Sequence, residues 1–104
     1  RWTNHACLGL LTLVAKDPLK PDAWQKFDKP VFASTANVTA PGHASFTTSL
    51  DGTQHWIVYH AARYPGAGWK RQTHIQPFYW TEQGSPVFGQ PVAPGILIQA
   101  PAGK

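Results

Sequence analysis

The sequence predicts an all-β fold built on an antiparallel meander. Ten prolines and nine glycines in 104 residues, with 12% aromatic residues and no methionine, favour strands and turns over helices. Asp51-Gly52 separates two strand-like runs, which is a strong hairpin signal. In the second run, residues 55–61, both alternating faces are largely apolar, as expected of a strand that is covered on both sides.

The first third of the chain predicts two short strands and a turn-rich segment between them. Residues 7–14 form an apolar run of strand length, consistent with a strand buried on both faces. Two prolines within residues 17–22 favour a turn, and residues 23–27 suffice for one short turn. Residues 30–33 form a brief strand that begins with proline, where no ladder donor is lost. Neither strand has an evident partner, so both are expected to form the outer half of a preceding unit.

Four strands are expected after a loop at residues 34–42. Hairpin, loop and turn signals separate them, and a four-stranded antiparallel meander is the form of one β-propeller blade. An isolated blade and a half would leave strand edges unpaired, so the segment alone is expected to fold poorly or to associate. The expected strands are residues 43–49, 55–61, 73–80 and 86–88.

Three regions follow from this pattern. We expect residues 1–33 to be outer strands of the penultimate blade and residues 34–90 to be the last blade. Residues 91–104 are rich in proline and glycine and are expected to form an extended C-terminal tail.

The charge pattern argues against nucleic-acid binding. The formal net charge is +4, but the nine basic residues are scattered rather than gathered in a stripe. No run approaches the roughly 18 apolar residues of a membrane-spanning helix, so neither nucleic acid nor membrane is an expected partner. The single cysteine, Cys7, lies in an apolar run and is expected to be buried and inert.

The acidic residues show no catalytic pair. Cleavage of a glycosidic bond needs two carboxylates that face each other across the sugar. The chain has five acids, and each lies in a segment where a turn is expected: Asp17, Asp22, Asp28, Asp51 and Glu82. Catalysis by this segment alone is therefore not expected.

The histidines are the better candidates for chemistry. His43 opens the first strand of the meander, which lines the central channel in a propeller, so its imidazole could bind a metal directly or through water. A hydrogen-bonded histidine at a strand end is the equal alternative. His60 is predicted to be a core histidine, and His74 faces either a pocket or solvent. His5 and His55 are expected to face solvent.

Two further motifs stand in expected loops. Trp69 precedes the cations Lys70 and Arg71, and aromatic faces stack on sugar rings while arginine grips hydroxyl groups. Asn37-Val38-Thr39 is an N-glycosylation sequon, which would matter in a eukaryotic secreted protein.

A set of short motifs resembles the closing part of glycoside hydrolase family 43. Each motif is weak alone, whereas their order and spacing between about residue 6 and residue 95 are specific. The similarity is to α-L-arabinofuranosidases, with β-xylosidases and arabinanases as relatives. The motifs are residues 7–12 (CLGLLT), 30–32 (PVF), 41–47 (PGHASFT), 51–52 (DG), 56–61 (WIVYHA), 75–78 (IQPF) and 84–89 (GSPVFG).

The resemblance implies a five-bladed propeller with its active site in a pocket on the axis. It implies an extracellular, inverting hydrolase that removes terminal α-L-arabinofuranosyl residues from polysaccharides such as arabinoxylan or arabinan. The family's catalytic carboxylates lie on its first three blades, which would precede Arg1, so the rest of the propeller is the implied partner. A β-xylosidase of the same family and a non-catalytic carbohydrate-binding module remain alternatives.

The resemblance also implies roles for individual residues. His43 matches an axial histidine that is associated with a central cation, often Ca²⁺ held through water. Arg71 and His74 fall in the stretch that supplies a pocket-lining residue. Trp69, which the resemblance does not cover, is a further expected substrate contact from its place beside the two cations. Family members often have arginine where this chain has His74, so the substrate contact is expected to have shifted to Arg71.

Overall fold

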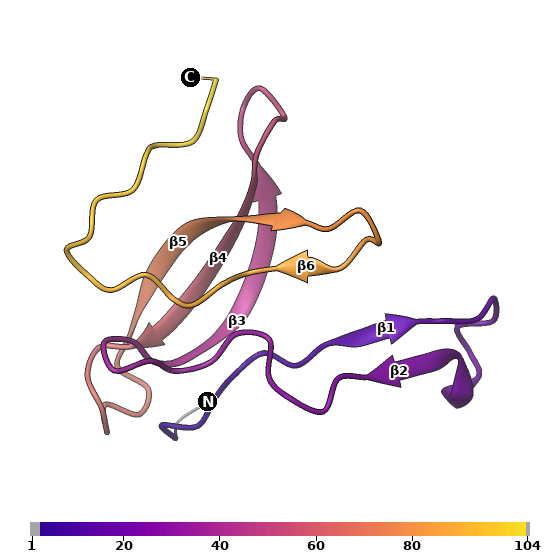
Figure 1. The fold of residues 1–104 in the computed structure, drawn as a ribbon. Helices are drawn as coiled ribbons and strands as arrows, with labels where there is room; N and C mark the ends of the chain where they lie inside the picture. The colour runs from indigo at the N-terminus through magenta and orange to yellow at the C-terminus, as the bar shows by residue number, and fades with distance from the viewer. Residues whose placement is uncertain (1–2, 104) are drawn as a thin grey trace.

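The three longest strands and the short β6 form a four-stranded antiparallel sheet that curls on itself (Figure 1). The computed structural model describes residues 3–103, and the order of this sheet is β3-β4-β5-β6. The prediction of an all-β antiparallel meander is therefore confirmed. The strands are β3 (Thr39–Thr48), β4 (His55–Ala62), β5 (Arg71–Trp80) and β6 (Pro86–Val87).

The hairpin between β3 and β4 is held by the carboxylate of Asp51, as its turn-forming role predicted. The hydroxyl groups of Ser49 and Thr53 both donate to Asp51 Oδ1, each at 2.7 Å. These hydrogen bonds, that of Ser49 first, lower the pKa of the Asp51 carboxyl from its ordinary value. Gly52 occupies the left-handed region with φ 76°, where a side chain would be strained.

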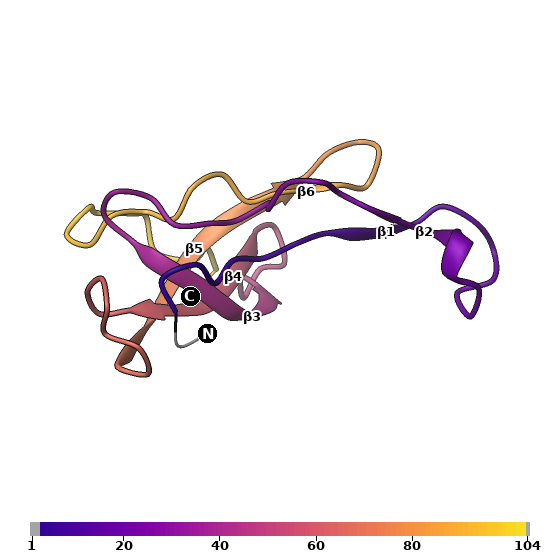
Figure 2. The same cartoon turned by 90° about the horizontal axis from the view of Figure 1, so that it is seen from below.

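A second, smaller sheet precedes the meander and projects away from it (Figure 2). It pairs β1 (Leu11–Leu13) with β2 (Trp24–Lys26), and the short 3₁₀ helix η1 (Pro21–Ala23) lies before β2. The expectation of one short turn at residues 23–27 is wrong, because Trp24, Gln25 and Lys26 pair with β1. The expected strand at residues 30–33 is reduced to an isolated bridge between Leu8 and Phe32.

The predicted burial of residues 7–14 is wrong in this structure. Leu11 and Leu13 are 57% and 44% exposed, and Cys7 is exposed rather than buried. The physical reason is that β1 pairs with β2 along one edge, while no layer of the described chain covers its faces. An apolar strand so exposed normally packs against a further layer.

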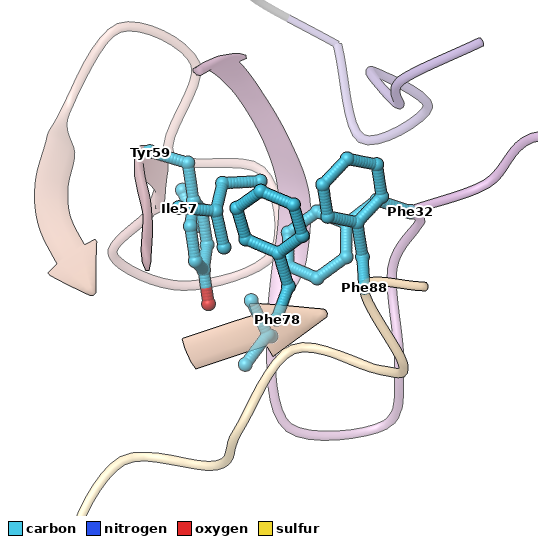
Figure 3. Close-up of a cluster of buried hydrophobic side chains, with 7 residues drawn as sticks. Phe32, Ile57, Tyr59, Phe78 and Phe88 are labelled. Atoms are coloured by element: carbon cyan, nitrogen blue, oxygen red, sulfur yellow. The ribbon is translucent and has the colours of Figure 1, made fainter. Parts of the chain in front are cut away.

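The core lies where the segment before β3 crosses the concave side of the large sheet. Phe32 is 1% exposed, and its ring meets Tyr59 of β4 edge to face at a centroid distance of 4.8 Å. Phe78 of β5 and Phe88, which follows β6, complete the aromatic cluster at a mutual distance of 4.9 Å (Figure 3). Edge-to-face packing of this kind stabilises the contact beyond its buried area.

The C-terminal tail is tied to the sheet by one buried amide. Gln76 Oε1 accepts hydrogen bonds from the Tyr59 hydroxyl and the Val92 backbone, and its Nε2 donates to the carbonyls of Phe88 and Gln90. Burial raises the pKa of Tyr59 to about 12, so this phenol keeps its proton at neutral pH. Among residues 3–103, no helix is long and apolar enough to cross a membrane.

Candidate functional site

The backbone of β3 departs from regular strand geometry around His43. Ala40 and His43 have positive φ values of 55° and 53°, and the pairing with β4 shifts register between Thr39 and Gly42 and again between Gly42 and Ser45. Left-handed backbone costs a non-glycine residue on the order of 1–2 kcal/mol. Bulges of this kind re-aim side chains and cluster beside functional sites.

His43 is exposed at this irregular point, where it lies beside His60 of β4. The centroids of the two imidazole rings are 5.5 Å apart. An open hollow of about 520 Å³ lies next to them, lined by Ala6, Cys7, Gly42 and His43. The prediction that His43 projects toward the central channel of a propeller concerns the assembled fold and is treated below.

Arg71, the first residue of β5, reaches across β4 to the bulged strand. Its Nε donates to His60 Nδ1 at 2.8 Å, and its Nη2 donates to the carbonyl oxygen of Ala40. Because His60 Nδ1 accepts a hydrogen bond, a neutral His60 ring carries its proton on Nε2. The predicted core histidine His60 is half-buried and belongs to this polar cluster.

His74 lies on the opposite face of the sheet from Arg71. Three positions separate the two residues on β5, and alternate residues of a strand point to opposite faces. His74 is paired with Tyr59, and the two rings stack at 5.2 Å with an interplanar angle of 15°. Burial lowers the pKa of His74 below its ordinary value of 6.5.

The structure therefore separates residues that the sequence placed together. His43, His60 and Arg71 gather on one side of the sheet, whereas His74 packs on the core side. Trp69 is 70% exposed in the loop before β5. His55 was expected to face solvent, but it is half-buried against Phe78 and Trp80, with His5 exposed as predicted.

The described residues do not supply a metal cage or a catalytic carboxylate pair. Within residues 3–103, no three His, Cys, Asp or Glu side chains lie together as metal ligands would. Calcium prefers oxygen ligands, so a cation near His43 would need donors from outside this segment. All five acidic side chains are exposed, four of them on turns or loops as predicted, whereas Asp22 lies in the 3₁₀ helix η1.

A second hollow that also borders His43 is mainly apolar. It measures about 620 Å³ and lies between the β1 segment and the large sheet. Its walls include Leu8, Phe46, Trp80 and Phe88, together with His43. A wall of this composition suits burial of further apolar side chains rather than recognition of sugar hydroxyl groups.

Sequence reasoning missed the contribution of His60 and of the Ala40 carbonyl. Arg71 stands 11 residues after His60 and 31 residues after Ala40. The registers of β3 against β4 and of β4 against β5, in which Ala62 pairs with both Thr39 and Arg71, bring the three together. The strand pattern predicted that these strands are neighbours but not which residues face each other.

The partial burial of His74 makes stability depend on pH. Because its folded-state pKa lies below 6.5, the unfolded chain binds the proton more readily as pH falls through that value. The full-length protein should therefore lose stability at pH 5 relative to pH 7.5, and His74→Phe should flatten this dependence. Urea unfolding midpoints at both pH values measure it. The exposed His5→Gln is the control, and an equal slope in wild type and His74→Phe would contradict the prediction.

Comparison with known proteins gives a consistent assignment. The family model described as "Glycosyl hydrolases family 43" matches residues 3–86. The chain is 41% identical over 103 residues to alpha-L-arabinofuranosidase 43 of Humicola insolens, a match that covers 89% of this chain and 21% of that protein. It is also 41% identical over 100 residues to the extracellular exo-alpha-(1->5)-L-arabinofuranosidase of Streptomyces avermitilis, covering 86% of this chain and 21% of that protein.

A solved structure agrees with the sequence matches. The crystal structure of alpha-L-arabinofuranosidase from Lactobacillus brevis superposes with a TM-score of 0.74 at 38% identity. The match covers 86% of this chain and 30% of that one. The chain spans about a fifth of the length of the curated relatives named above.

Proposed function

The chain belongs to glycosyl hydrolases family 43, and from that premise we propose that it is the last blade, with outer strands of the preceding one, of an α-L-arabinofuranosidase propeller. The proposed reaction is the removal of terminal α-L-arabinofuranosyl residues from plant polysaccharides such as arabinoxylan or arabinan. The observation that carries it is 41% identity to two arabinofuranosidases over most of this chain. Since those proteins are about five times longer, the activity is proposed for the whole protein.

The residues of this segment determine which parts of the active site it is proposed to supply. An inverting glycosidase holds its two carboxylates roughly 6.5–9.5 Å apart, one as acid and one as base for water. Because all five acidic side chains are exposed and stand in separate segments of the chain, these carboxylates would come from parts of the protein outside residues 1–104. This segment would contribute the His43, His60 and Arg71 side chains and part of the pocket wall.

The three regions of the chain take their proposed places in this propeller. Residues 34–90 contain the meander, residues 1–33 contain β1 and β2, and residues 91–104 contain the tail tied by Gln76. The exposed apolar surface of β1 and the hollow of about 620 Å³ support packing against further blades. The isolated segment, with these surfaces open, is expected to associate or to fold poorly.

A calcium ion held through water by His43 is part of the proposal, with its oxygen ligands outside this segment. No catalytic step is assigned to the ion. The sequence predicts Arg71, His74 and Trp69 as the other substrate contacts. In the structure, Arg71 Nε and Nη2 are engaged by His60 and Ala40, and His74 stacks on Tyr59 on the opposite face of the sheet, so the proposal gives direct sugar contact to Trp69. Of these, Trp69 is the most open to a sugar ring, because it is 70% exposed and aromatic faces stack on the C–H side of sugars. Secretion is proposed because one relative is named an extracellular enzyme.

The proposal is tested by the products of the purified full-length protein. We expect release of L-arabinose from α-1,5-arabino-oligosaccharides and from arabinoxylan, with the inverted β-anomer appearing first in ¹H NMR spectra. Preferential release of xylose from xylo-oligosaccharides would favour the β-xylosidase alternative. Binding of these sugars without any turnover would instead favour a non-catalytic carbohydrate-binding module.

A further inference from the structure

The left-handed backbone of β3 is not explained by the residues that adopt it. Ala40 and His43 carry side chains that disfavour positive φ, and Gly42, which would tolerate it, is not in that region. The pairing of β4 with β5 is regular over eight consecutive residues, so the irregularity belongs to β3 alone. Strain of this kind persists only where surrounding contacts impose it.

Side chains hold Ala40 where the sheet ladder does not. The Ala40 N–H donates to Ser34 Oγ at 2.7 Å, and its carbonyl accepts from Arg71 Nη2. Ala40 is completely buried, so both of its backbone groups need these partners. Arg71 also approaches the His60 carbonyl at 3.5 Å, which ties it to the strand between.

We propose that Arg71 is a positioning residue that clamps the bulge of β3 and thereby sets the place of His43. This inference rests on the proposed arabinofuranosidase function and gives Arg71 an indirect role in it. Nε and Nη2 form one edge of the guanidinium fork, and that edge is turned to His60 and Ala40. A bidentate grip on sugar hydroxyl groups through the same edge would break both contacts.

His60 is the second part of the clamp. It receives the Arg71 Nε–H on Nδ1, and its ring lies 5.5 Å from that of His43. The chain of contacts therefore runs from β5 through His60 to the exposed imidazole on β3. Loss of Arg71 would remove the hydrogen bond that orients His60 and the one that holds Ala40.

The clamp is tested first without substrate. In the full-length protein, Arg71→Met should speed hydrogen exchange of the backbone amides of residues 39–46, measured by mass spectrometry. Arg63→Gln is the matched control, since Arg63 Nε donates to the Arg71 carbonyl but reaches neither His60 nor Ala40. Unchanged exchange in Arg71→Met would overturn the clamp, whatever the protein hydrolyses.

Kinetics then separate positioning from substrate contact. If Arg71 acts through His43, Arg71→Met should lower kcat on the order of 100-fold with little change in KM. In a His43→Ala background, Arg71→Met should lower kcat by less than about threefold, because the effects of substitutions at two interacting residues are not additive. A raised KM with unchanged kcat, or fully additive costs, would overturn the positioning role.

A rescue variant tests the link to backbone strain. Glycine adopts positive φ without penalty. The double variant Ala40→Gly/Arg71→Met should therefore have a kcat at least about tenfold higher than that of Arg71→Met alone. Ala61→Gly, at an equally buried alanine of β4 without positive φ, should restore none. Equal effects of the two glycines would contradict the proposal.

Misfolding of Arg71→Met and inactivity of the wild-type protein each need a separate criterion. If Arg71→Met does not fold, Arg71→Lys keeps the charge but loses the paired Nε and Nη2 donors, and the same criteria apply to it. If the wild-type protein releases no arabinose, the proposed function fails, while the exchange experiment still decides whether Arg71 clamps β3.

Discussion

Phe32→Ala is expected to destabilise the full-length protein by about 3–5 kcal/mol, the largest effect of any substitution discussed for this chain. Phe32 is 1% exposed and contacts Tyr59 and Phe88 edge to face, at centroid distances of 4.8 and 6.0 Å. It joins the segment that carries β1 and β2 to the large sheet, so its removal leaves a cavity between two parts of the fold.

Urea unfolding followed by tryptophan fluorescence measures this effect. The control is Leu19→Ala in the turn between β1 and β2, where the side chain is 90% exposed. The control should change the free energy of unfolding by less than about 0.5 kcal/mol. A loss below about 1 kcal/mol in Phe32→Ala would show that the β1–β2 segment is not anchored through this ring.

Gln76→Leu is expected to cost about 3 kcal/mol. The amide is 3% exposed and makes four hydrogen bonds, which link the Tyr59 hydroxyl to the backbone at Phe88, Gln90 and Val92. Leucine fills a similar volume but leaves buried polar groups without hydrogen-bond partners. Each such group lowers the free energy of unfolding by about 1–3 kcal/mol where water cannot replace the amide. The same urea titration measures the loss, with exposed Gln25→Leu on β2 as its control.

A double variant identifies the cause of the loss. Gln76→Leu leaves the Tyr59 hydroxyl without its acceptor, and Tyr59→Phe removes that hydroxyl. The double variant should therefore lose less free energy of unfolding than the sum of the two single variants. Limited proteolysis should also cut the tail, residues 91–103, faster in Gln76→Leu. Additive costs together with an uncut tail would mean that the amide does not hold the tail.

The meander was predictable because its signals are local. Asp51-Gly52 and the apolar runs around Trp56 and Phe78 specify two hairpins within about 40 residues. β2 was missed because three residues carry little pattern, and Trp24 joins a strand only through its pairing with Leu13. The prediction that Leu11 is buried was wrong. An apolar sequence indicates that a strand packs against another layer, but it does not indicate which part of the protein supplies that layer.

The candidate site was predictable in part. His43 was predicted as a site residue from its position at the start of the meander, and it lines an open hollow in the structure, while its role stays a prediction. Its left-handed backbone and the Arg71–His60–Ala40 contacts depend on two register shifts in β3, which no local pattern encodes. The separation of His74 from Arg71 follows from strand alternation, and the sequence could have indicated it once both were placed on one strand.

A crystal structure of the full-length protein with bound arabinose tests the central account most directly. The account predicts that the sugar lies beside His43 and the start of β5, between two carboxylates from outside residues 1–104. A sugar bound away from both His43 and Arg71, or a catalytic pair formed by the acids of this segment, would contradict it.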